Sequence, residues 1–461
     1  MQRTSFKTWR KLWLNSTFVI RNLINKQKEV FSEMKLRERR TFILHILYSI
    51  FDGVCLGILA LNEFVFLKDI GAGSLQVGIL FQVQSFVMPF SIFLTYFMSR
   101  VKEKKKFLIR IALYTRLPLL LFIFFPDNVH ASPFKGVIIT LYLLIFLAYY
   151  LANPIILPVL NLFTKAIYRP NRFGRLFSYS LILNQLVLFF TTIFFGKLLD
   201  WQTNSYKYVF VFFGLIGFLS IYIITQIPYK EPKIKQIPRG KQFWKTVGRI
   251  FRDAVFILTK EKAFFDFERA MMVYGIGFMM ALTVVTIYLS QQFHLSFTEV
   301  ALYKNITILI SILSFPIFGR VMDDGGDPRK FAVVSFTFAA LFYALLAVAG
   351  IVDNQIFIGD YRIIIFLLIA FLLQGLFSGS MALIWGIGAT YFAPREEAAR
   401  FHAVHLSLTG IRGIIGPLLG VLIKYLFGFY GAFACIVGME IIAIYLMRKS
   451  VKTVLRPSIN I

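Results

Sequence analysis

Long runs of hydrophobic residues, separated by short polar gaps, occupy most of this 461-residue chain. Each run is close to the roughly 20 apolar residues that a helix needs to cross about 30 Å of hydrocarbon. Because a segment in lipid must satisfy its own backbone hydrogen bonds, we expect these runs to be helices. The pattern predicts about twelve membrane-spanning helices, at Thr41 to Leu67, Leu75 to Met98, Phe107 to Phe125, Gly136 to Phe163, Leu176 to Leu199, Val209 to Ile227, Ala270 to Ser290, Val300 to Gly319, Phe331 to Ile351, Ile363 to Phe392, Ala403 to Leu426 and Tyr430 to Met447.

The composition agrees with this pattern. Hydrophobic residues make up 58% of the chain and charged residues 16%, and the mean hydropathy is +0.71. These values are too apolar for a soluble globular protein. The sequence therefore predicts an all-α polytopic membrane protein.

Basic residues gather in alternate gaps between the predicted spans, within residues 3–40, 100–110, 165–175, 230–262 and 448–456. Loops rich in lysine and arginine face the cytoplasm in most membrane proteins. This bias predicts that both termini are cytoplasmic and that the chain is a multi-pass protein of the plasma (inner) membrane. Topology and anionic lipid headgroups explain the net charge of +27 better than nucleic-acid binding does.

The spans and gaps divide the chain into five regions. We expect a basic amphipathic segment at 1–40, a six-helix bundle at 41–228, a cytoplasmic linker with an amphipathic helix at 229–262, a second six-helix bundle at 263–447 and a basic tail at 448–461. The N-terminal segment is expected to lie on the inner leaflet, with a solvated tail as the alternative. Two halves with equal numbers of spans suggest an internal repeat.

The two halves resemble each other in sequence. Arg172-Phe173 and Arg400-Phe401 precede the fifth and eleventh spans, and the eighth span is followed by a loop with glycines, acids and basic residues from Gly319 to Lys330. With the six-plus-six arrangement and the long central linker, the chain resembles the major facilitator superfamily from about Thr41 to Met447.

This resemblance implies two pseudo-symmetric six-helix bundles that rock about a central cavity. In the family, an acid and basic residues of the loop signature latch the cytoplasmic gate. Gly319, Asp323, Arg329 and Lys330 match the signature, with extra residues inserted. The first-half copy departs from it, because Val101 stands where the acid is expected.

Ionisable residues inside the spans are candidates for function, since each costs about 2.5 to 3.5 kcal/mol on insertion scales. Asp52 lies at mid-depth in the first span, and Arg116 lies at similar depth in the third. Because burial disfavours the ionised form of a carboxyl group, Asp52 is a candidate to carry a coupling proton or to help bind sodium. The alternative is a structural ion pair between Asp52 and Arg116.

The eighth span contains Lys304 and Asn305 near its start, and no acid at matching depth is evident in the sequence. Lys304 is predicted either to extend along its stem toward the membrane surface or to act, with Asn305, as a polar group of the substrate cavity. In the second case it would attract an anionic or polar solute.

The eleventh span contains His405 and Arg412, which share a helix face because they are seven residues apart. Histidine titrates near neutral pH, which makes His405 a second candidate for proton coupling. Arg412 is predicted either to bind substrate or to form a structural bridge with Glu440 of the twelfth span, because both lie about equally far from the turn near Phe427.

Other polar and aromatic residues lie in spans that line the cavity in the family. The resemblance therefore implies that Tyr149 and Asn153 of the fourth span, and Gln374 and Trp385 of the tenth, are further cavity candidates. With 53 phenylalanines in the chain, most of its aromatic side chains are expected to face lipid or the core.

The sequence has no hydrolase triad, no phosphate-binding loop and no cluster with metal-ligand spacing. Its two cysteines lie in separate spans. We therefore expect no enzymatic activity, no cofactor and no metal, and we predict a monomeric secondary active transporter for a small solute, coupled to a proton or sodium gradient. The alternative is a lipid or lysolipid flippase on the same scaffold, and the third is a transport-inactive receptor or scaffold.

Overall fold

The computed structural model describes residues 34–87, 101, 103–202, 204–229, 248, 252, 255–323, 327–352, 355–358, 361–393 and 398–452. Almost all of its regular structure is helical. The elements of the first half are α2 (Leu36–Leu59), α3 (Asn62–Lys68), α4 (Ser74–Phe86), α6 (Lys104–Arg116), the 3-10 helix η2 (Leu117–Phe124), α7 (Lys135–Tyr150), α8 (Asn153–Lys165), α9 (Pro170–Trp201) and α10 (Tyr206–Thr225). Those of the second half are α12 (Lys262–Gln291), α13 (Phe297–Asp323), α14 (Pro328–Ala349), β1 (Gln355–Ile358), β2 (Tyr361–Ile364), α15 (Ile365–Ile387), the 3-10 helix η3 (Gly388–Phe392) and α16 (Ala398–Val451).

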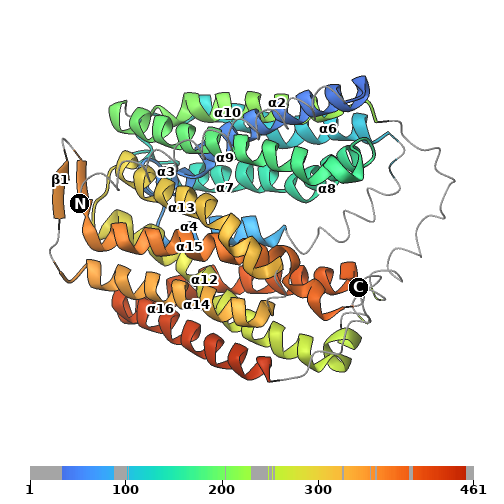
Figure 1. Cartoon of the computed structure of the whole chain (residues 1–461). Coiled ribbons are helices and arrows are strands. Elements are labelled where there is room, and N and C mark those ends of the chain that lie inside the picture. Colours follow the sequence, from blue (N-terminus) through green and yellow to red (C-terminus); the bar gives the residue numbers. More distant parts are fainter. Residues whose placement is uncertain are drawn as a thin grey trace, which may run out of the picture.

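The helices form two bundles, one from each half of the chain, which lie one above the other in Figure 1. Within the described residues, ten helical segments are long and apolar enough to cross a membrane. Two further spans account for the predicted twelve. The α4 helix covers the described part of the second span, and α16 contains two helices that are joined where Gly428 takes a φ of 70°. The predicted fold class is confirmed.

Several predicted spans are divided by a local break. In the fourth span, α7 ends at Tyr150 and α8 begins at Asn153, immediately before Pro154, whose ring nitrogen cannot donate a helical hydrogen bond. The first span is divided between α2 and α3 without a proline. Each divided segment, Leu36–Lys68 and Lys135–Lys165, is still long and apolar enough to span a membrane.

The two ends of the bundles differ in what they carry. The β1–β2 hairpin, in which Gln355 pairs with Ile364, marks one end, which we call the hairpin end (Figure 1). At the opposite end Arg37 donates a hydrogen bond to the carbonyl of Pro228 (2.6 Å), which places the start of α2 beside the segment that leads into the central linker. We call this the linker end.

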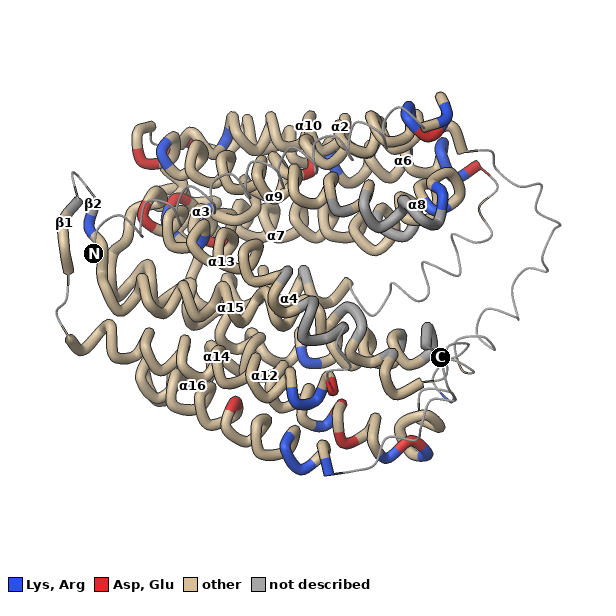
Figure 2. Tube along the Cα trace, in the orientation of Figure 1, with Lys and Arg blue, Asp and Glu red and all other residues tan. Residues whose placement is uncertain are grey.

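Charged residues lie mainly toward the two ends of the helices, and the middle of the bundles is largely uncharged (Figure 2). This distribution is what a membrane-spanning protein requires, because ions are costly in hydrocarbon. Three predictions lie outside the described residues, in whole or in large part. They are the amphipathic N-terminal segment, the surface helix of the linker and the end of the basic tail.

Candidate transport pathway and gate

The two bundles are joined at the hairpin end by an ion pair. The Lys304 ammonium group, on α13 of the second half, contacts the Glu63 carboxylate at the start of α3 in the first half. It also donates a hydrogen bond to the carbonyl of Ala60. The side chains of Lys304 and Glu63 are 26% and 13% exposed. The expectation that Lys304 lacks an acidic partner was wrong, because its partner lies in the other half of the chain.

A second contact between the bundles is a helix cap. Asp200 lies near the end of α9, and its two carboxylate oxygens accept hydrogen bonds from the backbone N–H groups of Phe297 (2.8 Å) and Thr298 (2.7 Å) at the start of α13. The first N–H groups of a helix have no partner within the helix, and a negative charge is favourable at this position. The first half of the chain therefore caps a helix of the second half.

The α9 and α13 helices continue this contact toward the middle of the membrane. A Cβ atom at Gly196 would lie 3.0 Å from the carbonyl oxygen of Phe297 and 3.1 Å from the Cβ of Ala301, so the two helices approach closely there. Further along, the Asn305 side chain donates a hydrogen bond to the carbonyl of Phe189 (3.0 Å). Asn305 thus contributes to the contact between the bundles.

The α4 helix forms the other side of this interface, against α16. Gln82 donates a hydrogen bond to the carbonyl of Ile414 (2.9 Å), and a Cβ atom at Gly413 would lie 2.4 Å from the Cβ of Ser85. At the hairpin end itself, Lys424 donates to the Ser74 hydroxyl (3.3 Å). Contacts on both sides of the interface therefore close the hairpin end.

Asp69 is a titratable group beside this closure and directly follows α3. Burial raises the pKa of its carboxyl group from the ordinary value near 3.8 to about 7, with Lys68 opposing the shift and the negative charge of Asp200 adding to it. Sequence reasoning missed Asp69, because it lies in a short gap between two apolar runs.

The two charged groups predicted for the middle of the first bundle do not form an ion pair with each other. The Asp52 carboxylate accepts a hydrogen bond from the Asn184 amide (3.0 Å). Arg116 donates to the carbonyl of Tyr149 (2.9 Å), and its guanidinium group lies 3.8 Å from the centre of the Tyr149 ring. The expected structural bridge between Asp52 and Arg116 is therefore absent, and Tyr149 is covered by Arg116.

A buried acid–histidine pair lies in the second bundle. The Nδ1 atom of His405, on α16, is 2.8 Å from the Glu268 carboxylate on α12, and the two side chains are 1% and 3% exposed. His405 Nε2 and Glu268 Oε2 are buried and have no hydrogen-bond partner in the part of the chain that the structure describes. Sequence reasoning found His405 but missed Glu268, because the apolar run of the seventh span was taken to begin at Ala270.

Arg412 and Glu440 do not form the expected bridge. Arg412 is buried against α12, where it donates to the carbonyl of Met271 (2.6 Å) and to the Thr409 hydroxyl (2.5 Å). Gly275 leaves room for it, because a Cβ atom there would lie 2.1 Å from the Arg412 Cδ. Both carboxylate oxygens of Glu440 are buried without a hydrogen-bond partner among the described residues.

The remaining cavity candidates are Trp385, Gln374 and Asn153, and each has different neighbours. Trp385 packs edge-on against Phe278, with ring centres 5.6 Å apart, and its buried indole N–H has no partner among the residues that the structure describes. Gln374 accepts a hydrogen bond from the Thr307 hydroxyl (3.3 Å). Asn153 is partly buried at the start of α8, next to the break in the fourth span.

The loop signature joins α13 to α14 at the linker end. Gly319 and Asp323 belong to the last part of α13, and Arg329 and Lys330 to the first turn of α14. Arg329 is buried, contacts the Asp327 carboxylate (2.8 Å) and donates to the carbonyl of Ser450 (2.6 Å). Asp327 is thus an acidic partner of Arg329, and it also caps α14 by accepting a hydrogen bond from the Arg329 N–H group.

A sequence profile described as Major Facilitator Superfamily matches residues 41–359 and 270–458. No curated protein sequence matches the chain.

Solved structures show the same fold at low sequence identity. The nucleoside transporter NupG is 12% identical, with a TM-score of 0.64 over 91% of this chain and 100% of its own. A peptide transporter POT in complex with sulfate is 12% identical, with a TM-score of 0.66 over 89% and 94%. A bacterial homologue of the human lysosomal transporter Spinster, in an inward-facing and unoccupied conformation, is 12% identical, with a TM-score of 0.60 over 92% and 100%.

Proposed function

The chain belongs to the major facilitator superfamily, and from this premise we propose that it is a secondary active transporter that moves a small solute by alternating access. In such a carrier two packed bundles exchange one set of contacts for another, so that a central site faces each side of the membrane in turn. The observation that carries the proposal is the closure of the hairpin end by contacts between the two halves, centred on Lys304 and Glu63.

The proposed orientation is based on the charge distribution. Described basic residues of the gaps lie at the linker end, where Arg37 and Lys105 donate hydrogen bonds to the carbonyls of Pro228 and Ile227. We therefore propose that this end faces the cytoplasm and that the hairpin end faces outward, with both termini cytoplasmic in the plasma membrane. A carrier that is closed on its outer side is in an inward-facing or an occluded state. One of the similar structures, the Spinster homologue, is inward-facing and unoccupied.

Lys304 acts in this proposal as a gate residue. When the bundles rock to open the outer side, α13 moves away from α3, and the ion pair with Glu63 must break. A substrate that enters from outside then meets a free ammonium group and a free carboxylate group. Lys304 thus combines a gate role with the cavity role that the sequence suggested.

The His405–Glu268 pair is proposed to couple transport to a proton gradient. An imidazole nitrogen in contact with a carboxylate gives a proton two neighbouring sites to bind. The pair joins α12 to α16, and α16 also packs against α4 of the first bundle. A change in its charge therefore acts on a helix at the interface between the bundles. Asp52, which joins α2 to α9 through Asn184, is the second candidate for coupling.

Uptake into proteoliposomes tests the proposal. Because similar structures are named nucleoside and peptide transporters, the first panel of solutes is nucleosides and dipeptides, tested under imposed proton gradients and under imposed sodium gradients. Accumulation of one class with one gradient supports a coupled carrier. Translocation of fluorescent lipid without solute uptake supports the flippase, and neither activity supports a receptor or scaffold.

A further inference from the structure

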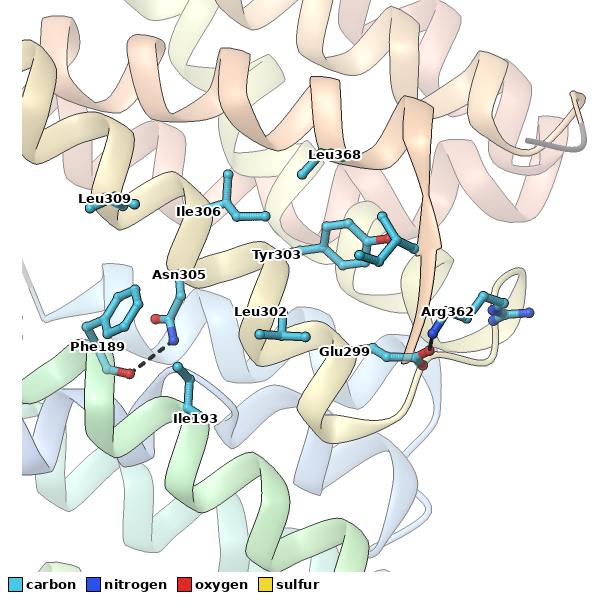
Figure 3. Close-up of a pocket in the computed structure, with 11 residues that line it drawn as sticks. Phe189, Ile193, Glu299, Leu302, Tyr303, Asn305, Ile306, Leu309, Arg362 and Leu368 are labelled. Carbon is cyan, nitrogen blue, oxygen red and sulfur yellow. Dashed lines mark hydrogen bonds between the residues drawn. The ribbon is translucent and has the colours of Figure 1, made fainter. Parts of the chain in front are cut away.

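A narrow pocket of about 210 Å³ lies where the two bundles meet at the hairpin end. Its apolar walls come from both halves, with Phe189 and Ile193 of α9 on one side and Leu302, Ile306 and Leu309 of α13 on the other. Figure 3 shows these side chains along neighbouring turns of the two helices. The start of α15 completes the wall with Leu368.

The pocket opens at the protein surface, because Leu309 in its wall is 47% exposed. Large exposed hydrophobic residues flank it on both helices, among them Phe190 and Phe194 on α9 and Leu313 on α13. All three belong to segments that are long and apolar enough to span the membrane. In a membrane, hydrocarbon chains cover such residues, so the pocket is continuous with the lipid-facing belt.

The length of the pocket matches one leaflet of a bilayer. From Glu299 to Leu309 the wall follows ten residues of α13, which corresponds to about 15 Å along a helix. The hydrocarbon core of a bilayer is roughly 30 Å thick, so the pocket extends over about half of it. Glu299, near the start of the helix, lies at the polar end of the pocket.

Most polar groups in the wall are already bonded within the protein. The Glu299 carboxylate accepts from the N–H groups of Ser296 (2.8 Å) and Arg362 (3.2 Å), and the Tyr303 hydroxyl accepts from Ile364 (2.9 Å). The Asn305 amide donates to the opposite helix, and its oxygen is buried below the surface with no partner within the described residues. A polar solute would find few partners here, whereas a hydrocarbon chain needs none.

We propose that an acyl chain of a membrane phospholipid occupies this pocket and stabilises the conformation in which the hairpin end is closed. The chain contacts α9 and α13 at once, and these contacts are lost when the bundles separate. The effect on conformation rests on the proposed alternating-access cycle, whereas the occupancy of the pocket does not.

The test uses the whole protein in nanodiscs of phosphatidylcholine that carry a photoactivatable acyl chain. Ile306→Trp fills the pocket, and Leu313→Trp places the same side chain on the exposed surface of the same helix as the matched control. We expect peptides that contain Ile193 and Ile306 to be labelled several-fold more than peptides from other lipid-facing surfaces. Labelling should fall at least fivefold in Ile306→Trp and remain unchanged in Leu313→Trp.

Equal labelling of both variants, or uniform labelling around the protein, would overturn the proposal. If Ile306→Trp does not fold, as judged by gel filtration and circular dichroism, Leu309→Trp replaces it as the pocket-filling variant. The proposal would also be overturned if the wild-type protein translocates fluorescent phosphatidylcholine and either pocket-filling variant abolishes this activity, because the lipid would then be cargo. Specific labelling without solute uptake would retain the lipid site and count against the transport function.

Discussion

Breaking the Lys304–Glu63 ion pair should open the hairpin end. Removing either charge leaves the other without its partner in a low-dielectric region. A charge at the bilayer centre costs about 2.5 to 3.5 kcal/mol. Because the two side chains are 26% and 13% exposed and lie near helix ends, we take about half of this, roughly 1.5 kcal/mol, which is close to a tenfold change in an equilibrium constant.

The assay is double electron–electron resonance, which measures the distance between two spin labels. The labels are placed at two exposed positions of the hairpin end, Trp201 in the first half and Phe357 in the second. Both native cysteines are replaced. We expect Lys304→Met and Glu63→Gln each to lower the ratio of short to long distances about tenfold. In the double variant this ratio should fall by less than the product of the two single effects, because neither charge is then left without its partner.

The control is an ion pair at the same end but within one bundle. Asp127 contacts Lys207, and both belong to the first half, so Asp127→Asn should leave the distance distribution unchanged. Strictly additive effects of the two gate variants would refute the ion pair as a gate. An equal effect of Asp127→Asn would refute the specificity of the argument.

Three further predictions concern protonation and packing. Burial raises the pKa of Asp69 to about 7, so the protonated carboxyl group favours the folded protein. This stabilisation is complete below about pH 4 and is lost as the pH rises to 7. The Tm of the wild-type protein should therefore fall over that range, whereas the Tm of Asp69→Asn should not. Glu268→Gln and His405→Gln should each abolish uptake driven by a proton gradient but retain solute exchange without a gradient, and equal loss of both activities would indicate a structural role. Gly275→Ala should lower the Tm, because the added Cβ would lie 2.1 Å from the Arg412 side chain. Such overpacking costs about 1 to 3 kcal/mol of folding free energy. An unchanged Tm would show that the Arg412 side chain moves to make room.

The number and the order of the spans could be predicted from the sequence because each apolar run must satisfy its backbone locally. The break in the fourth span also has a local cause, because the ring nitrogen of Pro154 cannot donate a helical hydrogen bond. The sequence similarity between the two halves indicated the family, which the sequence profile confirms. These features depend on residues that are close together in the chain.

Partners between helices could not be predicted in the same way. Arg412 and Glu440 lie at matching distances from the turn near Gly428, but equal depth does not place two side chains on facing surfaces, and Arg412 turns toward Gly275 of α12. Glu63 was not recognised as the partner of Lys304, because the two residues are 241 positions apart. Pairing of this kind depends on how the bundles pack, which one sequence does not report.

The cap that Asp200 provides for α13 links the secondary structure of one bundle to the position of the other. When the halves separate, the N–H groups of Phe297 and Thr298 lose their carboxylate acceptor, and the first turn of α13 becomes easier to unwind. The exchange of these two amide hydrogens with solvent then measures how often the outer side opens. A carrier with an unidentified cargo therefore contains its own reporter of the transport cycle, which can be followed without any substrate.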